Sequence, residues 1–368
     1  MEKHLLLGNG INIQFGGSEF TSAHIIKRIK NNSAANKYDS LFADKISGTD
    51  IISIFEGLVG VANSIIEGKH NDKSFDLDTT EAICDFMKRY TKKVSALHEI
   101  MLEDWLLLLH VFFSLNNDLM PIYQTAVQGF EQLLLDAIYN NGEIQKLYLK
   151  MNDEIKNFFL GYENIFTLNY DNNVESLTNR KVYHLHGDFS VLADSENPET
   201  ALGYIRTENG DTAWIAEMKH CYCNALLNYS GRLKYKTAMK KYLTILDSET
   251  YHNRYKNDIL FRTSLEINNS IEAQMIRTKI MHPELKMATD YYFSKFESIK
   301  GELDIIGLSP NNDQHIFDGI LNNKDLTKVV FYYHDGKERD YIESHYPNEL
   351  FDCLSVQELW KSLKCGKE

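Results

Sequence analysis

Ile165-Phe166-Thr167-Leu168-Asn169-Tyr170-Asp171 is an apolar run that stops abruptly on polar side chains. A second apolar run, Val182-Tyr183-His184-Leu185, leads directly into His186-Gly187-Asp188. Short apolar runs of this kind predict buried strands. Because an open α/β sheet gathers its strand ends at the crevice where a ligand binds, the leading hypothesis is a nucleotide pocket at these ends.

Two further predicted strands end on glycines. Leu5-Leu6-Leu7 runs into Gly8-Asn9-Gly10, and Asp304-Ile305-Ile306 runs into Gly307-Leu308-Ser309. Glycine lets a backbone approach a phosphate closely, and the N-terminus of a following helix favours negative charge. The first spacing is not G-x-G-x-x-G, because Ile13 stands three residues after Gly10. An ordinary strand-to-helix turn therefore remains an equal alternative at this loop.

Strand and helix signals alternate at both ends of the chain, which predicts an α/β fold with a Rossmann-like, mostly parallel sheet. Strands are expected at 3–8, 164–169, 181–185, 303–307, 328–333 and 351–354. Helices are expected at 21–30, 313–321 and 336–346, with a closing helix from Ser355. Residues 9–17 predict a glycine- and asparagine-rich loop, and residues 31–48 predict a surface loop.

Two long segments, 49–154 and 213–300, lack this alternation. Their apolar residues recur mainly at three- and four-residue spacing, which predicts helices. We therefore expect large helical insertions that form a helical layer or subdomain. The Rossmann-like domain is then discontinuous and comprises residues 1–48, 155–212 and 301–368.

The composition of the chain indicates which classes of partner are not expected. Its 368 residues are 43% hydrophobic, and the net charge is −13. An acidic chain repels a phosphate backbone, so direct nucleic-acid binding is not expected. The apolar stretch from Trp105 to Phe113 is too short to span a bilayer, and the N-terminus lacks the features of a secretory signal. We expect a soluble, cytoplasmic protein that does not contact a membrane.

One basic stretch interrupts the acidic chain. Residues 232–242 contain lysines, arginine and interleaved tyrosines. Such a stretch can bind nucleic acid or a partner protein, but a solvated amphipathic helix is the favoured interpretation, because charge runs on helices usually face water.

The cysteines do not indicate a metal site. There are five, and the only close pair is Cys221 and Cys223, next to His220. A structural zinc site needs four ligands, usually from two such pairs. The interpretation is therefore two half-buried helical cysteines, and no metal is expected.

Several polar side chains at the strand ends are candidates for chemistry. Asn169 and Asp171 can orient a ribose, although Asp171 is equally suited to an Asx turn before the next helix. His186 beside Gly187 can act as a general base near neutral pH. The alternative is a core histidine with a backbone hydrogen bond, and His184 on the same strand is the better candidate for that role.

These motifs, in this order, resemble those of sirtuin-type NAD-binding proteins. The glycine loop of that family matches Gly8-Asn9-Gly10-Ile11-Asn12, and its T-x-N-x-D motif matches the residues from Thr167 to Asp171. Its histidine–glycine pair matches His186-Gly187, and its G-x-S motif matches Gly307-Leu308-Ser309. The detailed forms are most similar to sirtuin-like effectors of bacterial antiphage defence, which hydrolyse NAD.

The resemblance has departures. Asn9 and Asn12 replace the alanine and serine of the family, and the paired CxxC motifs of the protein deacylases are missing. A deacylase is therefore disfavoured, and the glycine spacing disfavours an oxidoreductase. The Gly-Asn-Gly opening and the His-Gly pair also resemble the AbiH family of abortive-infection proteins.

The resemblance implies an NAD hydrolase that cleaves the nicotinamide–ribose bond and acts as a cell-suicide effector in antiphage defence. It implies catalysis by Asn169 and His186, with NAD as the substrate. It implies NAD binding by Gly8, Asn9, Gly10, Asn12, Thr167, Asp171, Gly307 and Ser309. By resemblance to members of that family, we also expect a homo-oligomer and a defence-system partner protein that acts as a sensor. The alternatives are an AbiH-like toxin with another substrate and a non-catalytic NAD or ADP-ribose sensor.

Overall fold

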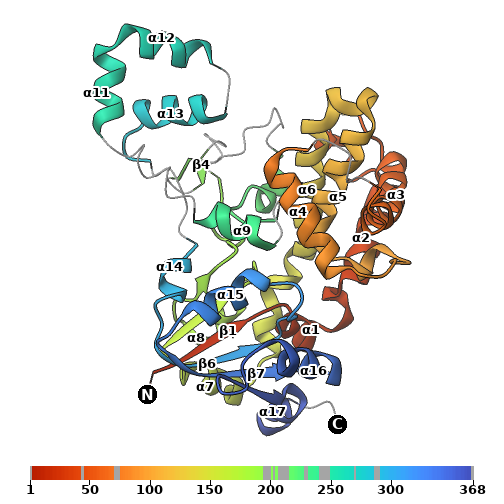
Figure 1. Cartoon of the computed structure of the whole chain (residues 1–368), viewed down its shortest axis with the longest axis vertical. Coiled ribbons are helices and arrows are strands. Elements are labelled where there is room, and N and C mark those ends of the chain that lie inside the picture. Colours follow the sequence, from red (N-terminus) through yellow and green to blue (C-terminus); the bar gives the residue numbers. More distant parts are fainter. Residues whose placement is uncertain are drawn as a thin grey trace.

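The computed structural model places a helical layer beside a sheet that is covered by helices (Figure 1). It describes residues 2–42, 45–69, 75–193, 200–201, 204–205, 215–227, 231–239, 249–268, 271–285 and 291–365.

The sheet has six strands, and every neighbouring pair is parallel. The strands are β1 (Lys3–Leu7), β2 (Asn164–Thr167), β3 (Tyr183–His184), β6 (Gly301–Ile306), β7 (Leu326–Tyr333) and β8 (Phe351–Ser355). Their order is β3-β2-β1-β6-β7-β8, which is 3-2-1-4-5-6 when these strands are counted along the chain. The predicted Rossmann-like α/β fold is confirmed.

The central strands β1 and β6 are buried on both faces of the sheet, which explains their apolar runs Leu5–Leu7 and Ile305–Ile306. Successive side chains of a strand point to opposite faces. Leu6 of β1 accordingly packs into one core, whereas Leu5 and Leu7 pack into another. The first core receives α14 (Phe293–Phe296), α15 (Gln314–Asn322) and α16 (Gly336–His345). The second receives α7 (Asp153–Leu160), α8 (Asn173–Thr178) and α17 (Val356–Ser362).

A third core fills the helical layer. The layer and its approach from β1 consist of α1 (Gly10–Gly16), α2 (Ser22–Ala34), α3 (Gly48–Ile66), α4 (Leu77–Arg89), α5 (Leu102–Leu115) and α6 (Tyr123–Tyr139). Short 3-10 helices lie at Gly17–Phe20, Asp39–Phe42, Leu97–Glu99, Asn117–Ile122, Asn140–Lys150 and Ala216–Cys221. The described part of residues 49–154 contains no strand.

The second helical region has two parts. Helix α9 (Gly231–Ala238) packs against α4 and α15, and so connects the helical layer to the sheet domain. Helices α11 (Glu249–Asn257), α12 (Ile259–Ile267) and α13 (Ile271–Met281) contact one another and lie farther from the sheet (Figure 1). A small antiparallel pair, β4 (Thr200–Ala201) and β5 (Tyr204–Ile205), lies near them.

Two loop predictions are wrong. Residues 9–17 are mostly helical, because α1 begins at Gly10, directly after the glycine turn. Residues 31–42 are mostly helical rather than a surface loop, since α2 continues to Ala34 and a 3-10 helix spans Asp39–Phe42. The reason is tertiary packing: Leu41 and Phe42 are buried in the core of the helical layer. The polar composition of the segment concealed these two anchors.

By length and composition alone, α3 is the one helix of the described residues that is long and apolar enough to cross a membrane. Its buried residues recur at helical spacing, from Ile51 and Phe55 to Leu58, Ala62 and Ile65. This face packs against α2 and α5. A core helix of a layered protein has the same properties.

The basic stretch is only partly the solvated helix that the sequence predicted. Lys234 on α9 is 2% exposed, and its Nζ lies 3.0 Å from a carboxylate oxygen of Glu103. Lys236, two residues on, is half exposed and pairs with Glu81. Residues 240–242 of the stretch lie outside the described residues. Burial of Lys234 is possible because its charge is paired at the junction of α9 and α5.

We expect Lys234→Met to lower the free energy of unfolding by about 3 kcal/mol, because it leaves Glu103 without its buried partner. The matched control on the same helix is Lys236→Met, which should cost at most about 1 kcal/mol because that pair is exposed. Denaturant unfolding of both variants measures the difference. Equal losses would show that the buried pair contributes no more than a surface one.

Candidate active site

The two glycine motifs meet at the centre of the sheet. In the strand order, β1 and β6 are neighbours, and the chain continues from them toward opposite edges. This is the topological switch point, where α/β sheets bind ligands beyond the carboxyl ends of their strands. Backbone hydrogen bonds join the two ends, from Gly8 N to Ile306 O at 2.9 Å and from Gly10 N to Gly307 O at 2.9 Å.

Glycine is required here because the two loops touch through their backbones. A Cβ on Gly10 would lie 2.5 Å from Cα of Gly307, and a Cβ on Gly8 would lie 2.5 Å from the carbonyl oxygen of Gly307. Gly307 itself has a φ of +76°, which other residues rarely adopt. The glycines therefore bring two strand ends into contact beside the cavity described next.

A cavity of about 590 Å³ opens over this contact. Eight of the ten predicted site residues line it: Gly8, Asn9, Gly10, Asn12, Asn169, His186, Gly307 and Ser309. The helical layer supplies part of the wall, including Met101, Leu102 and Glu103 at the start of α5. Beyond the glycines, the cavity extends past the end of β7 to Tyr332 and Trp360. Its size is within the usual range for small-molecule and cofactor sites.

Thr167 and Asp171 are not among the lining residues of this cavity. The hydroxyl of Thr167 donates to the carbonyl of Leu7 at 3.3 Å and accepts from the backbone N–H of Asn169 at 3.0 Å. It thus joins the ends of β1 and β2.

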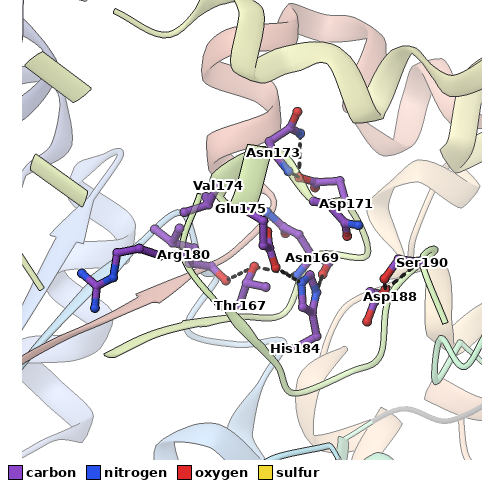
Figure 2. Close-up of polar contacts among 12 residues, drawn as sticks. Thr167, Asn169, Asp171, Asn173, Val174, Glu175, Arg180, His184, Asp188 and Ser190 are labelled. Carbon is purple, nitrogen blue, oxygen red and sulfur yellow. Dashed lines mark hydrogen bonds and ion pairs between the residues drawn. The ribbon is translucent and has the colours of Figure 1, made fainter. Parts of the chain in front are cut away.

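Asp171 is buried behind the cavity wall. It accepts hydrogen bonds from the side chain of Asn12 at 2.8 Å and from the backbone N–H of Asn173 at 3.2 Å. The second contact is the Asx turn that the sequence offered as an alternative (Figure 2). Burial raises the pKa of Asp171, although these hydrogen bonds act in the opposite direction. Asp171 therefore orients Asn12, which does line the cavity.

Asn169 lines the cavity and is held by its neighbours. Its side-chain N–H donates to the carbonyl of Gly8 at 3.2 Å. Its own carbonyl accepts a hydrogen bond from Nδ1 of His184 at 2.9 Å, and Nε2 of His184 lies 2.7 Å from Glu175 (Figure 2). Burial lowers the pKa of His184, but Glu175 outweighs it and raises that pKa to about 9. His184 has the backbone contact expected of a core histidine.

His186 reaches the cavity through the turn that follows β3. Gly187 has a φ of +79°, and a Cβ there would lie 2.2 Å from the carbonyl oxygen of Asn224. The segment after Asn224 braces this turn, since Leu226 N donates to the carbonyl of His186 at 2.8 Å. Burial lowers the pKa of His186 well below its ordinary value, so the imidazole is neutral at pH 7.

Sequence reasoning missed the closest polar neighbours of His186. His315, on α15, lies with its Nε2 3.0 Å from Nε2 of His186. Asp313 occupies the N-cap position of this helix, but its side chain makes no capping hydrogen bond and lines the cavity. Burial raises the pKa of Asp313 to about 7 and lowers that of His315 to about 3. The sequence signal that could have revealed these two residues is the pair Asp313-x-His315, which follows the strand predicted at 303–307.

Buried charged side chains lie next to the part of the cavity wall that the helical layer supplies. Arg89 donates to Asp104 at 2.6 Å, and the hydroxyl of Tyr90 donates to the same carboxylate at 3.0 Å. Beside them, Glu103 lines the cavity and is paired with Lys234. The pairing offsets the cost of burying each charge. The helical layer therefore places one paired carboxylate, Glu103, in a cavity wall that also contains apolar side chains such as Leu102.

The side chains of the segment from His220 to Cys223, considered above as a metal site, make hydrogen bonds to the helical layer. The thiol of Cys221 donates to the carbonyl of Gln132 at 3.2 Å, and His220 Nε2 lies 3.0 Å from Asp136. Both Cys221 and Cys223 are buried rather than half-buried.

Comparison of the chain with protein families, with curated proteins and with solved structures finds no match. The molecule is a Rossmann-like α/β protein with a cavity at the topological switch point of its sheet, lined by both polar and apolar side chains.

Proposed function

We propose that this protein is an NAD⁺ hydrolase that cleaves the nicotinamide–ribose bond and acts as a cell-suicide effector in antiphage defence. One observation carries the proposal. The two glycine motifs, Asn169 and His186 border one cavity at the switch point, although they come from three distant parts of the chain. This is where a Rossmann-like sheet binds a dinucleotide.

The protein has to perform little covalent chemistry in this reaction. Nicotinamide is already a good leaving group, because it departs from a cationic pyridinium, and the ribosyl bond breaks through an oxocarbenium-like state. The enzyme must orient the dinucleotide, exclude bulk water and place one attacking water. In the proposal, the glycine loops hold the pyrophosphate, and Asn169 orients the ribose or the water.

His186 is the proposed general base. Its neutral ring accepts a proton from a ribose hydroxyl or from the attacking water. The imidazolium so formed would be unfavourable in a buried place without a counter-charge. A carboxylate oxygen of Asp313 lies within 4.8 Å of the His186 ring nitrogen and supplies that charge when ionised.

The test is release of nicotinamide from NAD⁺ by the purified full chain, measured by chromatography, with NAD⁺ binding measured by calorimetry in parallel. We expect both binding and release. Failure to bind NAD⁺ would exclude the proposal and favour an AbiH-like toxin with another substrate.

A non-catalytic NAD or ADP-ribose sensor is the second candidate, and one contact favours it. The Nε2 atom of His186 faces His315 at 3.0 Å rather than open space. A base in this arrangement is engaged until His315 moves. Binding of NAD⁺ without nicotinamide release would support the sensor, or an enzyme locked in this state.

A further inference from the structure

Three potential metal ligands cluster beside the cavity: His186, Asp313 and His315. One nitrogen or carboxylate oxygen from each residue lies within 4.8 Å of the others. Both histidines are buried, at 2% and 4% exposure, whereas Asp313 borders the cavity. The turn after β3 and the start of α15 bring the residues together, although the two histidines are 129 residues apart in sequence.

Apart from the contact between the two histidines, these side chains have few hydrogen-bond partners among the described residues. Within the described ranges, no donor makes a hydrogen bond to the Asp313 carboxylate, which does not cap α15. The histidine rings are stacked, with centroids 5.2 Å apart and an interplanar angle of 24°. Two ring nitrogens that face each other at 3.0 Å cannot both present lone pairs, so either one of them donates an N–H···N hydrogen bond or a cation lies between them.

The spacing suits a metal ion. Two ligands at about 2.0–2.2 Å from one Zn²⁺ lie about 2.8–3.6 Å apart for angles of about 90–110° at the metal. The two Nε2 atoms already have such a separation, at 3.0 Å. A carboxylate oxygen of Asp313 lies within 4.8 Å of a ring nitrogen of each histidine, so a rotation of this side chain beside the cavity can bring it to the same ion.

We propose that His186, Asp313 and His315 bind one divalent transition-metal ion of the zinc class. Two imidazoles and one carboxylate are a donor set that zinc accepts, and the cavity leaves a coordination position open to water or ligand. Hard cations such as Mg²⁺ prefer oxygen ligands and should compete poorly.

The test uses the full chain after treatment with a chelator. Calorimetric titration with Zn²⁺ should give one site per chain, and Co²⁺ should give visible absorption bands without the near-ultraviolet band of thiolate ligation. That spectrum distinguishes the proposed site from the buried Cys221 and Cys223. Each variant, His315→Gln and Asp313→Asn, should lower the affinity more than about 100-fold, because even outer partners of a metal ligand contribute about 10–100-fold.

The matched control is His345→Gln, which removes an exposed histidine on α16 and should leave the affinity unchanged. Thermal unfolding checks that the variants are folded. If the wild-type chain binds neither Zn²⁺ nor Co²⁺, the proposal is wrong and an N–H···N hydrogen bond joins the two histidines. A thiolate band, or wild-type affinity in both His315→Gln and Asp313→Asn, would also overturn it.

One consequence rests on the proposed NAD⁺ hydrolysis. A metal on Nε2 of His186 occupies the lone pair that the base needs, so Zn²⁺ should inhibit nicotinamide release and a chelator should restore it. Metal binding without any hydrolysis in the chelator-treated chain would contradict the function and leave the metal site intact. Hydrolysis without metal binding would contradict the metal site and leave the proposed function intact.

Discussion

His186→Ala is expected to lower nicotinamide release from NAD⁺ by at least about 100-fold while NAD⁺ still binds, because a general base typically contributes about 10²–10⁴-fold. The glycine loops and Asn169 line the cavity independently of the imidazole. Removal of the ring therefore leaves most of the binding surface in place. Steady-state release and calorimetric binding, measured on the same preparation, separate the two effects.

The variant needs two controls, because His186 is buried against His315. His186→Asn keeps a polar group in the wall, and thermal unfolding of both variants shows whether the turn after β3 is intact. His345→Ala removes an exposed histidine and should hydrolyse NAD⁺ at the wild-type rate. Wild-type turnover by a folded His186→Ala variant would remove His186 from the mechanism.

Gly10→Ala is expected to damage both the fold and the cavity. Its Cβ would lie 2.5 Å from Cα of Gly307, and neither backbone can yield without separating the ends of β1 and β6. Overpacking of this kind costs about 1–3 kcal/mol or more. Because both loops line the cavity, NAD⁺ binding should fall together with the free energy of unfolding, and denaturant unfolding and calorimetry measure both.

Gly60→Ala on α3 is the matched control. Gly60 lies in a helix, and a Cβ there would have no atom within 4 Å. Alanine has the higher helix propensity, so this variant should be more stable than the wild type by up to about 1 kcal/mol. If Gly10→Ala behaves like Gly60→Ala, the contact between the two loops is not tight.

The sheet was predictable because its cause is local in sequence. Strands buried on both faces must be apolar over several residues, and β1 and β6 have that pattern. The right-handed crossover then favours parallel strands whose carboxyl ends share one edge. For this reason Gly8, Asn169 and Gly307 were expected close together, and they border one cavity.

Element boundaries were less predictable where tertiary contacts overrode composition. The polar segment after α2 reads as a loop, but Leu41 and Phe42 anchor it in the core. The basic helix α9 reads as solvated, but Lys234 is buried by its pairing with Glu103. Charge and polarity report the average behaviour of a residue type, whereas burial depends on one specific partner.

By itself, the sequence determined the sheet, the long helical segments and the strand ends that form the floor of the cavity, because periodicity and strand direction depend on neighbouring residues. Only the tertiary structure decided that Asp313 and His315 face His186, and that Glu103 of the helical layer lines the wall. These contacts join residues far apart in the chain, and their distances follow from how whole elements pack. No pattern within a single strand or helix contains that information.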